Sequence, residues 1–197
     1  LAGGPGSGKS YVVRQTTGGT GLVIINSDDA FEVLLKKAGL DMKMPDAEFD
    51  KREPLRTKAK QITGSRKENA VEGRLGLILD GTGKEYDKIV KHSTQLKQLG
   101  YDTHMIFVNT SLDTALERNA KRDRTVPTEI AVKAWKDVQS NIGKFSQHFR
   151  QNFIVVDNND TKEDVMTPVF KQIKTLLRKK ATSPIAKQWI MQQMKDR

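Results

Sequence analysis

The sequence contains no cysteine, and this absence excludes both a disulfide framework and any thiol chemistry. Its three histidines have no metal-ligand spacing, so no zinc or haem pattern is present. No apolar run approaches the roughly 20 residues that a membrane-spanning helix needs, and no signal-peptide pattern opens the chain. These absences favour a soluble, cytoplasmic protein with no membrane partner.

Acidic residues are in short supply relative to basic ones. The chain has 34 Lys and Arg against 24 Asp and Glu, a formal charge of +10. Residues 161–197 hold nine basic and three acidic side chains, which is +6 of that total. Such a stretch could bind nucleic-acid phosphates or an acidic surface. The plain alternative is a solvated, lysine-rich helix face.

The length of 197 residues suits one domain with its own core. Apolar runs typical of buried strands alternate with segments of helical periodicity, and this alternation predicts an α/β fold with a parallel sheet flanked by helices. The predicted strands are 22–26, 75–80, 104–109 and 153–157, and the predicted helices include 85–99, 111–122 and 127–142. Ser111 is a good N-cap for its helix.

The chain begins abruptly at Leu1-Ala2, directly before a glycine-rich motif. An ordinary strand is about five or six residues long, so we expect these two residues to end a truncated first strand whose start lies upstream. At the other end, Pro184 precedes a short amphipathic pattern with an apolar stripe that includes Trp189. We therefore predict a domain over 1–181 and a helical tail over 182–197. The tail is expected to pack against the domain, with a helix that binds a partner as the alternative.

The segment that follows the first two residues decides the class. Gly3-Gly4-Pro5-Gly6-Ser7-Gly8-Lys9-Ser10 matches the P-loop pattern G-x-x-x-x-G-K-[ST] at every required position. Glycines let the backbone N–H groups form a nest for phosphates, the lysine reaches the β- and γ-phosphates, and the serine hydroxyl binds Mg²⁺. We assign nucleotide binding to Gly4, Pro5, Gly6, Ser7, Gly8, Lys9, Ser10 and Tyr11.

Two predicted strands end in acidic residues. Carboxylates at the carboxyl ends of parallel strands lie in the crevice where such sheets bind ligands. After the strand 22–26, we expect Asp28 to accept a proton from a hydroxyl group and Asp29 to cap the next helix and contact substrate. At the end of the strand 75–80, Asp80 resembles a Walker B acid that would hold Mg²⁺ together with Ser10. Thr82, which follows it, offers a hydroxyl to the substrate.

Arginines cluster between the fourth strand and Pro127. Arg118 and Arg122 are four residues apart in the predicted helix 111–122, and Arg124 follows in a loop. Arginines on a closing lid stabilise the charge of a phosphoryl group in transfer, so we assign Arg118 and Arg122 to catalysis and Arg124 to substrate binding. Basic residues near a helix C-terminus also complement the helix dipole.

These segments together resemble the zeta-toxin and polynucleotide-kinase group of P-loop kinases over about residues 1–157. Asp80-Gly81-Thr82-Gly83-Lys84 is similar to a zeta-toxin segment that begins with Glu, and the stretches 25–29 and 117–127 look more like 5′-hydroxyl polynucleotide kinases. The resemblance implies a five-stranded parallel sheet of order 2-3-1-4-5, with Asp28 as general base beside Lys9, Ser10, Arg118 and Arg122. Phe31 stands where polynucleotide kinases usually carry Arg.

The leading hypothesis is a magnesium-dependent kinase that moves the γ-phosphate of ATP or GTP onto a hydroxyl. Two acceptors fit, a nucleotide sugar and a nucleic-acid 5′ end. The alternative is a P-loop ATPase or nucleotide switch that binds nucleic acid or protein through its basic C-terminal tail.

Overall fold

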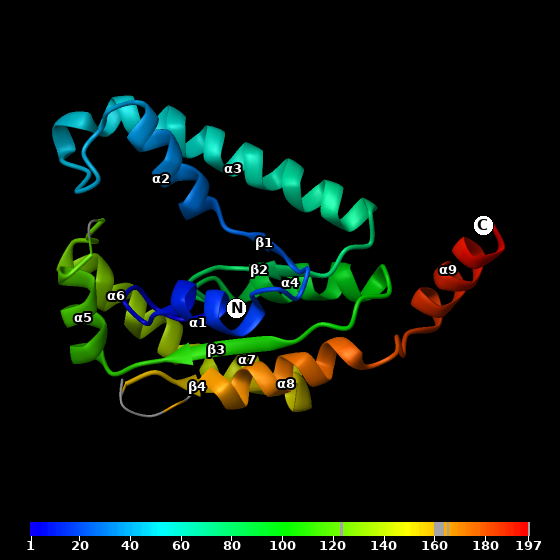
Figure 1. Cartoon of the computed structure of the whole chain (residues 1–197). Coiled ribbons are helices and arrows are strands. Elements are labelled where there is room, and N and C mark those ends of the chain that lie inside the picture. The colour runs from blue at the N-terminus through cyan, green and yellow to red at the C-terminus, as the bar shows by residue number, and fades with distance from the viewer. Residues whose placement is uncertain (123, 160–163, 165, 197) are drawn as a thin grey trace.

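A computed structural model describes residues 1–122, 124–159, 164 and 166–196. Helices and parallel strands alternate along the chain, as the α/β prediction requires (Figure 1). In chain order the elements are α1 Lys9–Thr17, β1 Val23–Ile25, α2 Ser27–Lys37, η1 Asp46–Glu48, α3 Phe49–Glu72, β2 Leu77–Leu79, α4 Tyr86–Gln98, β3 Met105–Asn109, α5 Leu112–Ala120, α6 Thr128–Ser140, α7 Ile142–Phe149, η2 Arg150–Asn152, β4 Phe153–Asp157, α8 Met166–Arg178 and α9 Pro184–Lys195.

The described strands form two parallel pairs, β1 with β2 and β3 with β4. The first residues of the chain lie between these pairs: the Ala2 N–H donates to Ile106 O at 2.9 Å, and the Gly3 N–H donates to Thr82 O at 3.0 Å. Ala2 forms only an isolated bridge with Phe107 rather than a strand. If the first residues count as strand 1 and β1 to β4 as strands 2 to 5, these hydrogen bonds agree with the order 2-3-1-4-5. The five-stranded sheet itself stays a prediction.

We call residues 1–17 and 81–178 the P-loop half of the molecule, because they carry that loop and the covered strands. Two groups of buried apolar side chains cover β3 and β4 from opposite sides. One consists of Ala2, Met105, Phe107, Val138, Phe145 and Phe149. The other consists of Val12, Val108, Val156, Val169 and Ile173. Helices α1 and α8 supply the second group, while α6 and α7 supply the first, so the strands of this half are held on both faces.

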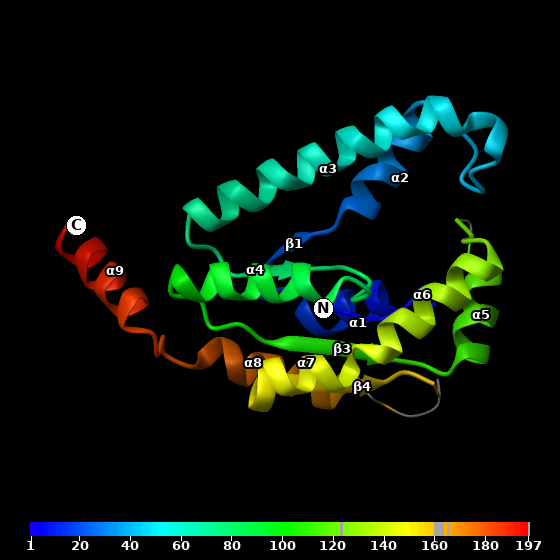
Figure 2. The same cartoon turned by 180° about the vertical axis from the view of Figure 1, so that it is seen from behind.

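We call residues 23–79 the α2–α3 half. Its buried side chains, Phe31, Leu35 and Ala59, join α2 to α3 rather than either helix to the strands. All residues of β1 and β2 are only half-buried. Figures 1 and 2 show α2 and α3 side by side along one border of the molecule. Helix α3 is one continuous helix of 24 residues.

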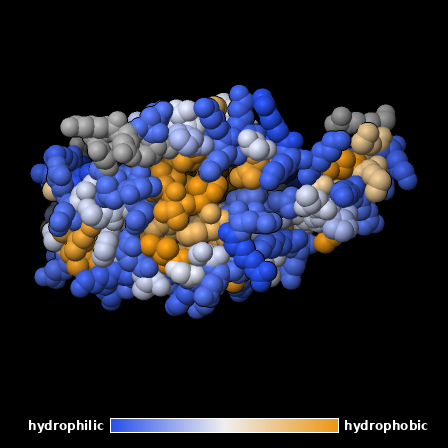
Figure 3. Space-filling view, turned by 90° about the horizontal axis from the view of Figure 1, so that it is seen from below, coloured by the Kyte–Doolittle hydropathy of each residue, from blue (hydrophilic) through white to orange (hydrophobic). Residues whose placement is uncertain are grey.

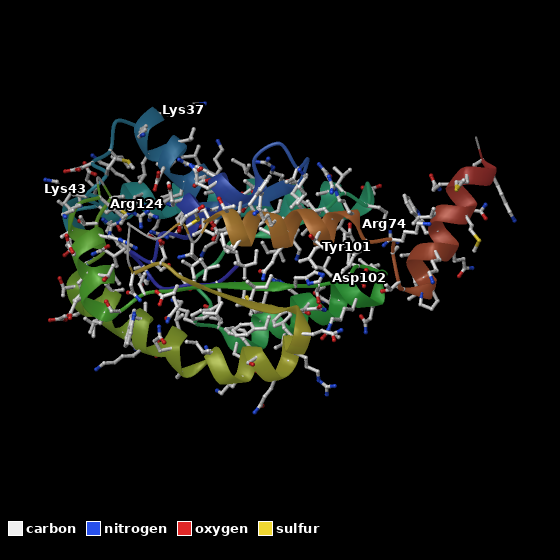
Figure 4. All side chains as sticks on the ribbon, turned by 60° about the horizontal axis from the view of Figure 1, so that its bottom comes forward. Lys37, Lys43, Arg74, Tyr101, Asp102 and Arg124 are labelled. Carbon is white, nitrogen blue, oxygen red and sulfur yellow. The ribbon has the colours of Figure 1, made fainter. Side chains whose placement is uncertain are left out.

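The predicted C-terminal helix forms, with Pro184 in its first turn. None of its described residues is buried, so its packing against the domain stays a prediction. Its first turn touches the body at Gly100, and Thr182 just before it donates a hydrogen bond to Asp102 at 3.0 Å. Figure 4 shows Arg74, Tyr101 and Asp102 gathered where this helix leaves the body.

The lower surface of the P-loop half exposes apolar side chains. In the view from below in Figure 3, hydrophobic residues gather in the middle of the face, where β4 lies between α7 and α8. Val155 of β4 is half-exposed there. Among the described residues, β4 pairs only with β3, so its outer edge remains open.

Candidate functional site

The P-loop adopts a backbone that only glycine tolerates at two of its positions. Gly6 and Gly8 have φ angles of 75° and 83°, in the left-handed region. A Cβ atom on Gly6 would collide with the carbonyl of Ala115, and one on Gly8 would collide with the side chain of Asn158. Helix α1 begins directly after Gly8, so its N-terminus and the N–H groups of the loop face the same space.

Lys9 extends back over this loop. Its ammonium group donates a hydrogen bond to the Gly4 carbonyl at 3.2 Å. Burial lowers the pKa of Lys9, while the nearby carboxylate of Asp80 partly offsets that effect and Arg122 adds to it. Asp28 raises the pKa of Lys9 as Asp80 does, so charged residues from three other segments act on this lysine.

Three buried polar atoms around the loop have no hydrogen-bond partner among the described residues: Ser7 Oγ, Asp80 Oδ1 and Thr110 Oγ1. Each belongs to the P-loop itself or follows a strand at the sheet's carboxyl edge. Buried polar groups in proteins are almost always paired, so a cluster of unpaired ones indicates that a polar ligand or ion completes the site.

Asp80 is suited to a cation. Its Oδ2 accepts a hydrogen bond from the Asn26 amide at 2.9 Å, which leaves Oδ1 unpaired and fixes the carboxylate in one orientation. Burial raises the pKa of Asp80, and the Lys9 charge opposes that shift. Mg²⁺ takes few protein oxygens and several from water and phosphate, so Ser10 and Asp80 are sufficient donors for it. Among the described residues, no three His, Cys, Asp or Glu side chains form a metal cluster.

The cap of α2 differs from our expectation. The side chain of Asn26 caps this helix, since its Oδ1 accepts the Asp28 N–H at 2.8 Å. Asp29 lies in the first turn and is not the cap; its Oδ1 accepts a hydrogen bond from Asn26 Nδ2 at 3.3 Å. Burial raises the pKa of Asp29. Sequence analysis missed Asn26, which links the first turn of α2 to Asp80.

Arg124 lies between two carboxylates of α2. Its Nε donates to Glu32 Oε1 at 3.0 Å, and its NH2 lies 3.3 Å from Asp28 Oδ2. Figure 4 shows Arg124 between α5 and the α2–α3 pair. We had not singled out Glu32. The available signal was its position four residues after Asp28, which puts both carboxylates on one helix face.

The two remaining arginines do not share a helix face. Helix α5 ends at Ala120, so Arg122 lies beyond it, and our prediction of a helix that carries both Arg118 and Arg122 is wrong. The chain turns after Lys121, which serves as the C-cap. Ser111, by contrast, is the predicted N-cap, because its Oγ accepts the Thr114 N–H at 3.2 Å.

Arg118 instead organises the loop after β4. Its NH1 donates to the Asn158 carbonyl at 2.6 Å, and the Asn158 amide donates to the Ser7 carbonyl at 2.8 Å. A chain of contacts therefore runs from α5 through this loop to the P-loop. Asn158, which sequence analysis also missed, is buried in this arrangement.

Two assigned residues contribute less than expected to this geometry. The side chain of Tyr11 is 56% exposed on α1. Thr82 contacts the P-loop through its backbone carbonyl, which accepts the Gly3 N–H, while its side chain forms no hydrogen bond within the described part of the chain.

A cavity of about 820 Å³ lies elsewhere, between α3 and the start of β1. Val23, Ile62, Ala70 and Leu75 line it together with polar side chains of α3. Val23 is at the amino end of its strand, so this cavity opens at the opposite edge of the sheet from the P-loop.

Within the described residues, no helix is both long and apolar enough to cross a membrane. A search of curated proteins found no significant match. The sequence profile of the zeta toxin family matches residues 1–167, which is most of the chain.

Solved structures with a similar fold include a candidate kinase from Chloroflexus aurantiacus, with a TM-score of 0.58 and 15% identity over 90% of this chain and 93% of that one. A deoxyadenosine kinase from M. mycoides with bound dATP gives a TM-score of 0.47 and 19% identity over 88% of this chain and 97% of that one. The first likeness supports the α/β P-loop fold.

Proposed function

Because the chain belongs to the zeta toxin family, we propose that it transfers the γ-phosphate of ATP or GTP to a hydroxyl group of a nucleotide sugar. Family membership makes the chain a P-loop kinase. The observation that supports the site most is the group of buried, unpaired oxygens around the P-loop, Ser7 Oγ, Asp80 Oδ1 and Thr110 Oγ1, with Asn26 joining Asp80 to the first turn of α2. A kinase needs a phosphate cradle, a base, a metal ligand and a cation around one phosphoryl group.

In this proposal the P-loop residues Gly4 to Gly8 hold the phosphates of the donor through backbone N–H groups, and Lys9 compensates the charge of the β- and γ-phosphates. Ser10 and Asp80 would hold Mg²⁺, which when bound neutralises charge on the same phosphates. Asn26 keeps the Asp80 carboxylate oriented. The unpaired oxygens of Ser7 and Asp80 support a polar ligand here.

Asp28 is the proposed general base. Its side chain is 52% exposed at the carboxyl end of β1, so an incoming hydroxyl can reach it. The acceptor oxygen forms a bond to the γ-phosphorus, its proton moves to Asp28, and the bond from the γ-phosphorus to the bridging oxygen breaks to release the nucleoside diphosphate. Arg122 and Arg124 are proposed to compensate charge on the phosphoryl oxygens, and Arg118 to hold the adjoining loops in place.

A nucleic-acid 5′ end is the competing acceptor. The zeta toxin match and the Asp-Gly-Thr-Gly segment at Asp80 favour the nucleotide sugar. The lid sequence 117–127 and the +10 charge favour the 5′ end. Both acceptors present a hydroxyl next to phosphates, so the basic surroundings of Lys9 suit either one.

The experiment that tests the proposal is transfer of labelled γ-phosphate from ATP and from GTP to UDP-sugars, nucleosides and 5′-hydroxyl oligonucleotides. We expect a UDP-sugar to be labelled and Lys9→Ala to abolish the product. Labelling of the oligonucleotide alone would show that the acceptor is a nucleic-acid 5′ end instead of a nucleotide sugar. Release of inorganic phosphate with no labelled acceptor would favour an ATPase instead.

A further inference from the structure

The ion pairs of the molecule fall into two kinds. Within the described residues there are five, and three of them join neighbours three or four positions apart. The other two both belong to Arg124, and they connect the loop between α5 and α6 to α2, with Asp28 and Glu32 as the partners. Arg124 therefore makes the long-range ionic link between the P-loop half and the α2–α3 half.

The two carboxylates do not hold Arg124 equally. Glu32 accepts a hydrogen bond from Nε at 3.0 Å, whereas Asp28 lies 3.3 Å from NH2 in an ion pair without hydrogen-bond geometry. The Arg124 side chain is only 10% exposed, that of Glu32 is 32% exposed and that of Asp28 is 52% exposed. The guanidinium is thus anchored on the more buried carboxylate, and the open carboxylate keeps room for another partner.

This division has a chemical consequence. A general base needs a free lone pair toward the hydroxyl that it deprotonates, and a full two-point bond to an arginine would occupy Asp28. Glu32 takes the hydrogen bond that fixes the arginine, so the cation stays next to Asp28 without capturing it. The spacing of four residues on α2 makes this sharing possible.

Resting on the proposed function, we infer that Glu32 is a positioning residue that holds Arg124 and its loop against α2, so that the loop covers the acceptor while Asp28 remains available. Glu32 itself touches neither donor nor acceptor. It acts through Arg124 and through the closure of the two halves on each other.

The contact can be tested without any substrate. We expect Glu32→Ala to speed hydrogen exchange of the backbone between residues 119 and 127 about tenfold, because the loop loses its anchor. The matched control is Glu53→Ala, which removes an ion pair with Arg56 within α3 and should leave that exchange unchanged. Exchange in Glu32→Ala equal to that of the parent would overturn the inference.

The catalytic consequence is tested with labelled ATP and whichever UDP-sugar or 5′-hydroxyl oligonucleotide the parent phosphorylates. Glu32→Ala should lower kcat about 10- to 100-fold with an unchanged ATP Kd, since hydrogen bonds to charged groups are among the stronger ones. Glu32→Gln keeps an oxygen that can accept a hydrogen bond from Nε, so its kcat should be at least about threefold higher than that of Glu32→Ala. The Glu32→Ala, Arg124→Ala double variant should be no slower than Arg124→Ala alone.

Additive losses in that double variant, or a Gln variant as slow as the Ala variant, would overturn the positioning role. If the parent labels no acceptor at all, the proposed function fails, and the exchange measurement alone then decides whether Glu32 holds the loop. The two failures are therefore distinguishable.

Discussion

Helices cover β3 and β4 on both faces, whereas β1 and β2 are half-exposed along their whole length. In the P-loop half, buried side chains such as Phe107 and Val108 point to opposite sides of one strand and meet different helices. In the α2–α3 half, Phe31 and Leu35 bury themselves against α3, and no residue of β1 or β2 belongs to a buried cluster. The first half has a core, and the second is a helix pair attached to two strands.

This difference matches the two tasks of the proposed kinase. A phosphate cradle must be rigid, because its N–H groups have to point at the phosphates before they bind. An acceptor site has to open and close, and segments with few buried apolar contacts open at low free-energy cost. In the proposed kinase the packed half would therefore bind the donor and the loosely held half the acceptor, with Arg124 as the ionic link between them.

The largest expected effect comes from the buried phenylalanines of the two halves. Phe107→Ala should destabilise the whole protein by roughly 3–5 kcal/mol, the usual cost of deleting a buried phenyl ring, and should move the urea midpoint of both halves together. Phe31→Ala removes an equally buried ring, yet we expect it to speed hydrogen exchange in residues 27–72 while ATP affinity stays within about twofold. A Phe31→Ala variant that loses ATP binding would show that the halves unfold as one.

The next effect separates the donor site from the rest of the fold. Lys9→Ala should weaken ATP binding by at least about 100-fold, which is roughly 2.7 kcal/mol, because the β- and γ-phosphates lose their cation. Stability should not fall, since burial lowers the pKa of this lysine and its charge is costly in the free protein. Titration calorimetry with ATP measures the affinity, and Lys36→Ala on α2 is the control for loss of a single positive charge.

A smaller, pH-dependent effect is expected at Asp80, the proposed metal ligand. The folded state raises the pKa of Asp80, so it binds a proton more tightly than the unfolded chain, and the contribution of Asp80 to stability falls as pH rises from its ordinary value of about 3.9. Asparagine has no proton to lose. The stability of Asp80→Asn relative to the parent should therefore increase with pH over that range, as measured by urea unfolding without Mg²⁺. A difference that is constant with pH would mean that Asp80 is not perturbed.

The smallest effect should come from the tail. Removing residues 182–197 deletes a helix with no buried residue, so the free energy of unfolding should change by less than about 0.5 kcal/mol and ATP affinity should not change. If the tail binds nucleic acid, the affinity for an oligonucleotide should instead fall as salt rises. The slope of log affinity against log salt concentration should be near −0.7 per phosphate neutralised on a single strand, and truncation should make that slope less steep. No binding at low salt would leave its charge as a solvated face.

Local patterns predicted the elements of this fold well. The four strands lie within two residues of their predicted ends, and Ser111 caps α5 as expected. The N-cap of α2 could not be predicted from the local sequence, because all four residues there are good N-cap residues: Asn26, Ser27, Asp28 and Asp29. Only the backbone conformation of the folded chain shows which of them is the cap.

The differences concern a helix boundary and long-range pairing. The spacing of Arg118 and Arg122 suggested that one helix carries both, but the helix ends at Ala120 and Lys121 is its C-cap. Sequence periodicity does not determine the last residue of a helix. The bond of Arg124 to Glu32 spans 92 residues and has no local signature. The amphipathic stripe predicted that α9 packs against the domain, and this stays a prediction, because none of the described residues of α9 is buried and a stripe alone does not identify the surface that it contacts.

The central claim is that Asp28, on the loosely held half, deprotonates an acceptor hydroxyl beside the phosphates held by the other half. The most direct test is single-turnover phosphoryl transfer by Asp28→Asn and Asp29→Asn. Asparagine keeps the size of the side chain but cannot take the proton, so Asp28→Asn should slow transfer roughly 10²- to 10⁴-fold at unchanged ATP affinity. Asp29→Asn should be mild. Transfer at the parental rate in Asp28→Asn would contradict the account.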